Sequence, residues 1–155
     1  MASRVEFTFL SDEFYTTYPA DEYSEIERKV DRPYTQVIIS LSSVIWAIPL
    51  RSHIAHPHVF WTDKANGCGI DYTKAVPVIK EEYFDRVRQP HIRQKEFNAM
   101  RGKGFRIKKG FEKYISDYFS AKSDLDKAIN KTLVEKSTLQ YFEEYLNTEQ
   151  DSDTN

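Results

Sequence analysis

Two apolar runs separated by a pair of serines constrain the fold of this chain more than any other feature. The segment 34–41 has the sequence YTQVIISL, the segment 44–50 has the sequence VIWAIPL, and Ser42-Ser43 lie between them. Branched side chains pack well on a pleated surface, and a two-residue connection joins neighbouring antiparallel strands. The spacing therefore predicts an antiparallel hairpin. Pro49 lacks an N–H for pairing, so we expect the end of the second strand at an edge or a bulge.

Weaker strand signals lie on either side of this hairpin. Partial alternation over 5–10 predicts a strand, and Ser11 is the expected cap of a short helix after it. The segment 51–69 contains His, Pro, Asn and Gly and predicts a long loop, with a short strand at 59–61. The segment 70–79 predicts a further strand. Because long loops in compact domains are often functional, 51–69 is the first place to seek a site.

Apolar residues take a helical spacing beyond Glu81. One face is formed by Phe111, Tyr114, Ile115, Tyr118 and Phe119. Two shorter stripes are Leu125, Ile129 and Leu133, with Ser123 as the expected N-cap, and Leu139, Phe142 and Leu146. We predict one α+β domain over residues 1–148, a compact and strongly bent antiparallel sheet with helices added mainly from the C-terminal half. Residues 149–155 are expected to form an acidic disordered tail.

Composition restricts the location and the class of protein. The 155 residues suffice for one domain with a core. No apolar run approaches the roughly 20 residues of a membrane helix, and the first ten residues lack the pattern of a signal peptide. We therefore expect a cytoplasmic protein that does not bind membranes. The single Cys68 excludes an internal disulfide and a zinc site built on paired cysteines.

Charge is distributed unevenly along the chain. The whole chain has 22 Lys and Arg against 24 Asp and Glu, a net charge of −2. The segment 86–113 holds ten Lys and Arg against Glu96 and Glu112, so its net charge is +8 and that of the remainder is −10. Such a local basic patch would attract a polyanion such as a nucleic acid. The alternative is that the segment is only the solvent-exposed, lysine-rich face of a helix. The residues expected to bind RNA phosphates are Arg86, Arg88, Arg93, Lys95, Arg101, Lys103, Arg106, Lys108 and Lys109.

Four segments, taken in order, resemble the toxins of type III toxin–antitoxin systems. They are Arg32-Pro33-Tyr34, then 48–53 (IPLRSH), 56–64 (HPHVFWTDK) and 69–75 (GIDYTKA). The resemblance covers roughly residues 5–120. It is to the CptN and TenpN subgroup, which is related to the ToxN/AbiQ-like family.

This resemblance implies a fold and an activity. The fold would be related to the MazF/Kid-like barrel. The activity would be that of an endoribonuclease that needs no metal and no cofactor. It would cut single-stranded RNA at preferred sequences and leave 2′,3′-cyclic phosphate and 5′-hydroxyl ends.

The resemblance also implies partners. A repeated pseudoknot RNA antitoxin would inhibit the toxin, be processed by it and form a ring-shaped protein–RNA assembly with it. Cellular or phage RNA would be the substrate, in phage defence by abortive infection.

Metal-free RNA cleavage needs a base for the 2′-hydroxyl, cationic or N–H donors for the phosphorane, and an acid for the leaving oxygen. We expect Arg51 to stabilise the phosphate through its fixed donors, unless it is a surface arginine paired with a carboxylate. We expect Ser52 to hydrogen-bond a phosphate oxygen, unless it is a loop cap. His53 is the expected proton-transfer group, because histidine titrates near neutrality. Tyr34 is expected to contact the phosphate or stack on a base, unless it is a sheet aromatic. In the ToxN branch a lysine follows this serine; here Arg51, His53 or Lys64 would replace it.

Further RNA contacts are expected around this cluster. The residues concerned are Lys29, Arg32, His56, His58, Trp61, Asp63 and Lys64. Trp61 would stack on a base and Asp63 would orient a histidine or bind a base edge, unless Trp61 is a hydrophobic anchor beside a solvated turn.

Two other interpretations remain open. His53, His56 and His58 with Asp63 could hold zinc in a metal-dependent nuclease. The same fold could also belong to an RNA-binding adaptor without activity.

Overall fold

The predicted hairpin lies at the centre of the sheet. In a computed structural model of the protein, which describes residues 5–29 and 31–146, strands β2 (Gln36–Leu41) and β3 (Val44–Arg51) pair antiparallel. Ser42 and Ser43 both have positive φ, 49° and 69°, as a type I′ turn requires. The hairpin and its two-residue turn are therefore confirmed.

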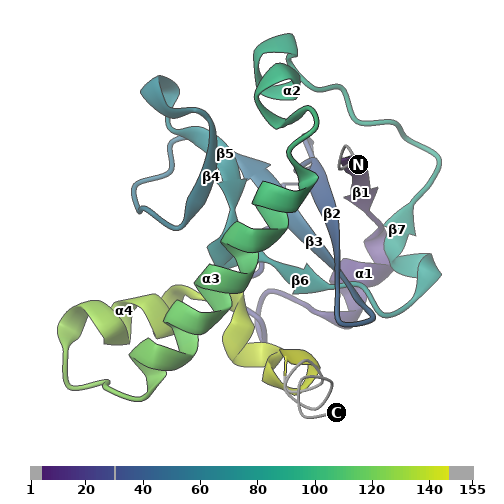
Figure 1. The fold of residues 1–155 in the computed structure, drawn as a ribbon. Coiled ribbons are helices and arrows are strands. Elements are labelled where there is room, and N and C mark those ends of the chain that lie inside the picture. Colours follow the sequence, from purple (N-terminus) through teal and green to yellow (C-terminus); the bar gives the residue numbers. More distant parts are fainter. Residues whose placement is uncertain (1–4, 30, 147–155) are drawn as a thin grey trace.

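Seven strands form one antiparallel sheet (Figure 1). The others are β1 (Glu6–Leu10), β4 (Val59–Asp63), β5 (Cys68–Asp71), β6 (Val76–Pro77) and β7 (Phe84–Asp85). The order is β4-β5-β3-β2-β1-β7, and β6 pairs with the first part of β3. In the described part of the chain β4 and β7 end this order and do not pair with each other, and β6 pairs with β3 alone, so the sheet is open and does not form the expected barrel.

Pro49 lies on a central strand of the sheet, and the predicted edge is present only locally: Pro49 is paired with Gln36 of β2 on one side and with neither β5 nor β6 on the other. The N–H of Leu50 donates to the carbonyl of Thr35 at 2.8 Å, on the β2 side. Because N–H groups alternate along a strand, the nitrogen of Pro49 points to the opposite side. There β3 changes its partner, from β6 at Ala47 to β5 at Leu50. The missing N–H of the proline therefore points to a gap between β6 and β5, where no strand would accept a hydrogen bond from it.

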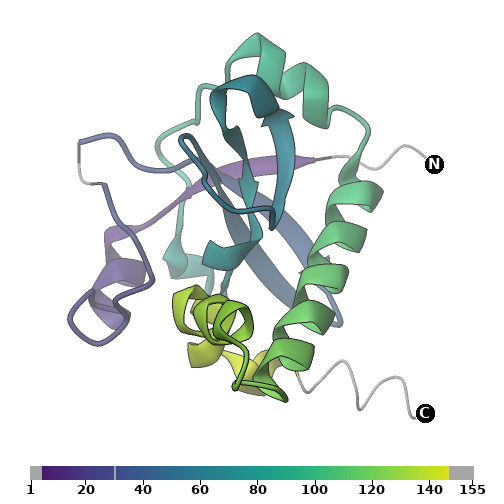
Figure 2. The ribbon, with the colours of Figure 1, turned by 90° about the vertical axis from the view of Figure 1, so that its left-hand side faces the viewer.

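The helical elements follow the strands mainly in the second half of the chain. The α-helices are α1 (Asp12–Thr17), α2 (Gln94–Met100), α3 (Gly104–Lys122) and α4 (Ala128–Lys136). Single 3₁₀ turns span Lys64–Asn66, Tyr72–Lys74, Glu81–Tyr83 and Thr138–Tyr141. Figure 2 shows α3 along one side of the sheet and α1 on the other. The α+β class with a helical C-terminal half is confirmed, and no helix among the described residues could cross a membrane.

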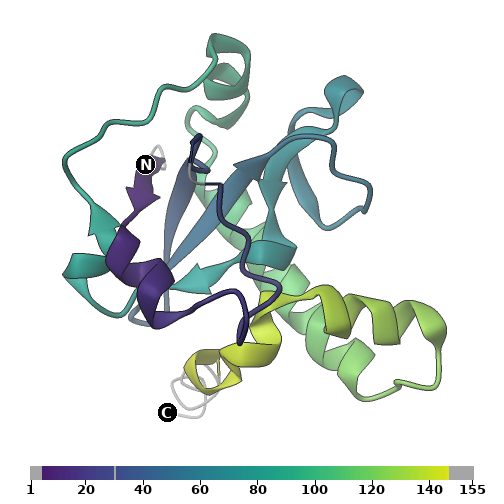
Figure 3. The same ribbon diagram turned by 180° about the vertical axis from the view of Figure 1, so that it is seen from behind.

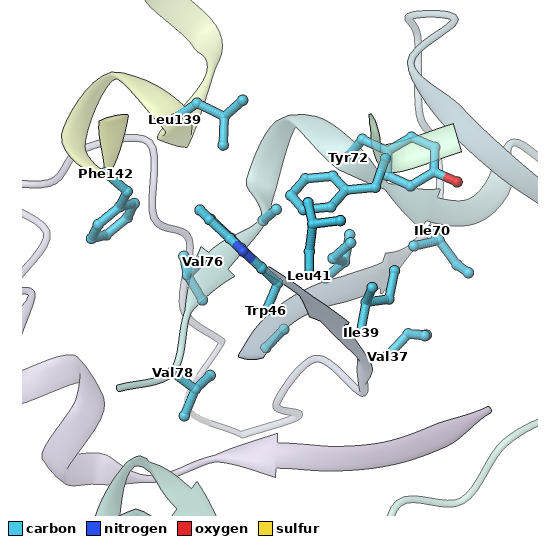
Figure 4. Close-up of a cluster of buried hydrophobic side chains, with 14 of the residues drawn as sticks. Val37, Ile39, Leu41, Trp46, Ile70, Tyr72, Val76, Val78, Leu139 and Phe142 are labelled. Atoms are coloured by element: carbon cyan, nitrogen blue, oxygen red, sulfur yellow. The ribbon is translucent and has the colours of Figure 1, made fainter. Parts of the chain in front are cut away.

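The core lies between the sheet and α3 and continues to the C-terminal 3₁₀ turn (Figure 4). Trp46 of β3 meets Phe111 of α3 with ring centres 5.3 Å apart. At Gly110 a Cβ would lie 2.3 Å from the hydroxyl of Tyr72, so α3 approaches this turn too closely for any side chain there. That hydroxyl donates to the carbonyl of Ile107 at 2.8 Å.

Two of the three predicted apolar stripes are buried, and the stripe Leu125, Ile129 and Leu133 is not. In α3 four of the five members are buried and Phe119 is half-buried; Leu139, Phe142 and Leu146 are also buried, which confirms both stripes. The prediction of a buried stripe at Leu125, Ile129 and Leu133 is wrong, because Leu125 and Ile129 are 46% and 78% exposed. Ser123 ends α3, and Lys127 is the N-cap of α4. The C-terminal end of α3 and α4 extend past the sheet (Figure 3), so α4 packs mainly against α3, with fewer contacts to the C-terminal 3₁₀ turn.

Two other local predictions have clear outcomes. Ser11 caps α1 as expected, accepting from the N–H of Phe14 at 3.3 Å. The single strand predicted over 70–79 is wrong: β5 ends at Asp71, a 3₁₀ turn follows, and β6 is a separate strand. The side chain of Asp71 causes the break by accepting from the N–H of Thr73 at 3.0 Å. The predicted tail, 149–155, lies outside the described residues.

Candidate functional site

The hairpin register places Tyr34 opposite Arg51. The hydrogen bond from Leu50 to Thr35 continues the pairing of β2 and β3 by one residue beyond Gln36. Arg51 lies five residues after Trp46, whose side chain faces α3, so strand alternation directs Arg51 to the other face of the sheet. Its guanidinium carbon lies 5.9 Å from the centre of the Tyr34 ring.

Two carboxylates hold the Arg51 guanidinium. Its Nη1 donates to Asp71 Oδ2 at 2.5 Å, and its Nη2 donates to Glu27 Oε2 at 2.8 Å. The Tyr34 hydroxyl donates to the same Glu27 oxygen at 3.2 Å. Burial opposes the charge of Arg51, but the hydrogen bond and charge of Asp71, with the charge of Glu27, outweigh it and raise the pKa of Arg51.

Asp71 is the fixed member of this network. Its side chain is completely buried and also accepts from the N–H and hydroxyl of Thr73, the latter at 2.6 Å. His56 Nε2 lies 3.1 Å from Asp71 Oδ1. Burial alone would raise the pKa of Asp71, but His56, Thr73 and Arg51 lower it to about 2. Asp71 therefore remains an anion, and its buried carboxylate fixes the Arg51 guanidinium from the interior side.

His56 and His58 belong to this support. The Nδ1 of His56 accepts from the backbone N–H of His58 at 3.1 Å, which assigns the ring proton to the nitrogen that faces Asp71. The ring centre of His58 lies 5.7 Å from that of His56 and 5.4 Å from that of Tyr114, and burial lowers the pKa of His58. Neither imidazole lines the groove described next, so the structure does not bring these two predicted RNA contacts into it.

An open groove of about 770 Å³ lies beside the ends of β2 and β3. Seen from behind (Figure 3), the segment that leads into α2 arches on one side and the β4–β5 hairpin lies on the other. The predicted residues that line this groove are Lys29, Arg32, Tyr34, Arg51, Ser52, His53 and Arg93. Asp31 and Glu96 also line it. The structure therefore brings the four proposed catalytic side chains together with three of the expected RNA contacts, Lys29, Arg32 and Arg93.

His53 occupies a conformation that non-glycine residues seldom adopt. Its φ is +56°, and its Nδ1 lies 3.2 Å from the hydroxyl of Ser52. The N–H of the next residue, Ile54, donates to the carbonyl of Gly67 at 3.0 Å, and a Cβ on Gly67 would lie 3.2 Å from the nitrogen of Ile54. Residues in such strained backbone conformations often occur at functional sites, where the strain fixes the direction of a side chain.

The other predicted residues of the 51–69 loop lie outside the groove. Trp61 is half-buried on β4, and Lys64 is exposed on a 3₁₀ turn. Asp63 is buried and accepts from Asn66 at 2.8 Å and from Lys95 at 3.1 Å. Asp63 and Lys95 therefore link β4 to α2, and Asp63 does not orient a histidine as predicted.

The basic segment does not form one surface. Arg86, Arg88 and Arg93 pair with Glu81, Asp85 and Glu96, respectively, and Lys109 pairs with Glu112. Of these only Arg93 lines the groove. Four cations at the junction of α2 and α3 have no ion pair with any described residue: Arg101, Lys103, Arg106 and Lys108. Phe105, 62% exposed, lies among them.

Sequence reasoning missed three residues of the site. His91 lines the groove, on the segment between β7 and α2, and Pro90 before it in a basic stretch was an available signal. Asp71 had been noticed only within the resembling segment 69–75, although a carboxylate between two apolar residues indicates a buried partner. No local pattern around Glu27 indicates its contact with Arg51.

The proposed zinc ligands do not come together. His53 lies in the groove, His56 and His58 lie behind Asp71, and Asp63 is bound to Lys95. Among residues 5–29 and 31–146 no group of three His, Cys, Asp or Glu side chains is arranged to hold a metal ion.

Known proteins give no assignment for this site. No family model, no curated protein and no solved structure matches this chain. The arrangement that remains is a held guanidinium, two hydroxyl groups and two imidazoles along one groove. These groups can bind an oxyanion and move protons near neutral pH.

Proposed function

We propose that the protein is a metal-independent endoribonuclease that cuts single-stranded RNA. The observation that supports this most is the meeting of Arg51, Ser52 and His53 from β3 and the turn after it with Tyr34 from the neighbouring strand, in one open groove. Lys29 and Arg32, among other groups, add positive charge along the groove, where an RNA backbone would be attracted.

The chemistry follows from these groups. His53 takes the proton of a ribose 2′-hydroxyl, and the 2′-oxygen attacks the adjacent phosphorus. Arg51 and Ser52 stabilise the charge that accumulates on the phosphorane oxygens. The bond to the 5′-oxygen breaks as a second group supplies that oxygen with a proton. We assign this group to His91, which lines the same groove from a different segment. The products are a 2′,3′-cyclic phosphate and a 5′-hydroxyl.

The biological setting is part of the same proposal. The resemblance of the segments around Arg51 suggests the toxin of a type III toxin–antitoxin system, acting in the cytoplasm in phage defence. A repeated pseudoknot RNA would be the antitoxin, inhibiting the toxin in a ring-shaped assembly and being processed by it. Kinship with the MazF/Kid-like toxins also belongs to this proposal, for a sheet that is open rather than closed into a barrel.

The first experiment is to incubate the protein with a long single-stranded RNA in EDTA and to map the new ends. We expect discrete cuts with 2′,3′-cyclic phosphate ends. Arg51→Ala should reduce the cleavage rate by roughly 10²–10³-fold, and His53→Ala or His91→Ala by roughly 10²–10⁴-fold. Each histidine variant should also lose one limb of the pH–rate profile.

The matched control is Arg86→Ala, which removes an arginine that is paired outside the groove. It should cleave like the unmodified protein. Tight RNA binding without cleavage would indicate a binding adaptor, and cleavage only after addition of a divalent metal would indicate a metal-dependent nuclease. Either result would contradict the proposed mechanism.

A further inference from the structure

The two groups best placed to bind a phosphate are both engaged by a carboxylate of the same chain. Arg51 Nη2 and the Tyr34 hydroxyl donate to one oxygen of Glu27, at 2.8 Å and 3.2 Å. A carboxylate and a phosphodiester present similar acceptor oxygens to a guanidinium. Glu27 therefore occupies the position in which a bound oxyanion would receive the same two hydrogen bonds.

The two carboxylates around Arg51 differ in how firmly they are held. The Asp71 side chain is 0% exposed and accepts hydrogen bonds from three residues, whereas the Glu27 side chain is 40% exposed. Within the described residues Glu27 has no hydrogen bonds besides those from Arg51 and Tyr34. It also lies on a segment that is neither helix nor strand. Asp71 is thus the permanent partner of Arg51, and Glu27 is the replaceable one.

Two lysines, Lys74 and Lys29, lie near the position of the Glu27 carboxylate. Lys74 lines the same small cavity as Glu27, Tyr34 and Arg51, and the Lys29 ammonium lies 5.2 Å from the centre of the Tyr34 ring. An anion at this point is therefore favoured by more positive charge than Glu27 alone neutralises.

We propose that Arg51 and Tyr34 form an oxyanion subsite that Glu27 fills in the free protein and that a phosphodiester group of RNA takes over by displacing Glu27. The choice of RNA as the ligand rests on the proposed function, whereas the subsite itself rests on the contacts of Glu27. The carboxylate then has two effects: it keeps Arg51 aligned when RNA is absent, and it competes with the incoming phosphate.

Glu27→Gln tests the displacement, with Glu22→Gln as its matched control. Glu22 is exposed on the same segment, and its replacement changes the net charge equally. Two probes are used: inorganic phosphate, followed by its effect on thermal unfolding, and a single-stranded RNA with 2′-deoxy positions, which binds but cannot be cut. We expect Glu27→Gln to bind the oligonucleotide about five-fold more tightly than Glu22→Gln, because a like charge next to the phosphate is removed. Phosphate should also stabilise it more.

Equal or weaker binding by Glu27→Gln than by Glu22→Gln would overturn the inference and would make Glu27 only a counterion of Arg51. Glu27→Ala serves as a second variant, and adding Tyr34→Phe to Glu27→Gln should remove part of the gain. Neither binding probe depends on cleavage. If Glu27→Gln binds both probes more tightly but the unmodified protein cuts no RNA, the subsite stands and the proposed activity fails. If RNA is cut and the two glutamine variants bind alike, the activity stands and the inference fails.

Discussion

At the scale of single residues, Asp71 links stability to the site. It is buried at the end of β5 and accepts hydrogen bonds from Arg51, His56 and Thr73, which come from three separate points of the chain. Burying a charge is costly unless it is paired and hydrogen-bonded, and here every partner is a donor. The same bonds that offset this cost fix the direction of the Arg51 guanidinium.

This arrangement predicts a specific loss of stability in acid. The pKa of Asp71 is about 2 when folded, below its usual value near 3.8, so its contribution is fully present above about pH 4 and is lost as the pH falls towards 2. The contribution is about 2 kcal/mol. Urea unfolding between pH 2 and 5 should show this part of the pH dependence in the unmodified protein and not in Asp71→Asn. The control is Asp126→Asn, an exposed aspartate; equal pH slopes in the two variants would contradict the assignment.

At the scale of elements, the β2–β3 hairpin determines which residues meet. A two-residue turn at Ser42-Ser43 starts the register at Leu41 opposite Val44, and continuing this register brings Tyr34 opposite Arg51. Both turn residues have positive φ, which costs a residue with a side chain roughly 1–2 kcal/mol. The turn is therefore a place where the fold is less stable than it could be.

Ser43→Gly should stabilise the protein. Glycine adopts positive φ without the Cβ clash, and after subtraction of its greater flexibility in the unfolded chain the gain should be about 0.5–1 kcal/mol. Urea denaturation measures the difference in the free energy of unfolding. Ser40→Gly, an exposed position within β2, should instead lose about 0.5–1 kcal/mol. A similar loss in both variants would mean that the turn is not strained.

At the scale of the whole molecule, positive charge is divided between two regions. Arg93 and the cluster around Arg51 line the groove beside the ends of β2 and β3. The junction of α2 and α3 holds Arg101, Lys103 and Arg106, which have no ion pair with any described residue and do not line the groove. A short RNA in the groove would not reach this junction, whereas a longer one could pass around α2.

The division predicts a dependence on RNA length. Lys103→Ala with Arg106→Ala should leave the binding of an RNA of roughly four to six nucleotides unchanged. For a long RNA the same variant should bind more weakly, and its salt dependence, the slope of log K against log salt concentration, should fall by roughly 0.7 for each lost phosphate contact. Fluorescence anisotropy at several salt concentrations measures both. The control of equal charge is Lys127→Ala with Lys131→Ala, at the N-cap and on the second turn of α4. Equal losses in the two double variants would contradict a specific contact at the junction.

Patterns between near neighbours in the sequence determined the local elements. The β-branched runs and their two-serine turn specified the hairpin, the i, i+4 spacing from Phe111 onward specified the buried face of α3, and Ser11 specified the start of α1. Each depends on interactions within one strand pair, one helix or one cap, where the residues involved are close along the chain. The grouping of Arg51, Ser52 and His53 is also local, since they are consecutive.

Only the tertiary structure decided which distant residues share the site. It moved His56 and His58 behind Asp71, brought His91 and Arg93 into the groove, and divided the segment 86–113 between two regions. It also placed Glu27 on Arg51, 24 positions away in the chain. The physical reason is that these contacts form only when α2 and the 24–29 segment pack against the sheet. The residues next to each of these side chains in the sequence do not encode the distant partner that this packing brings to it.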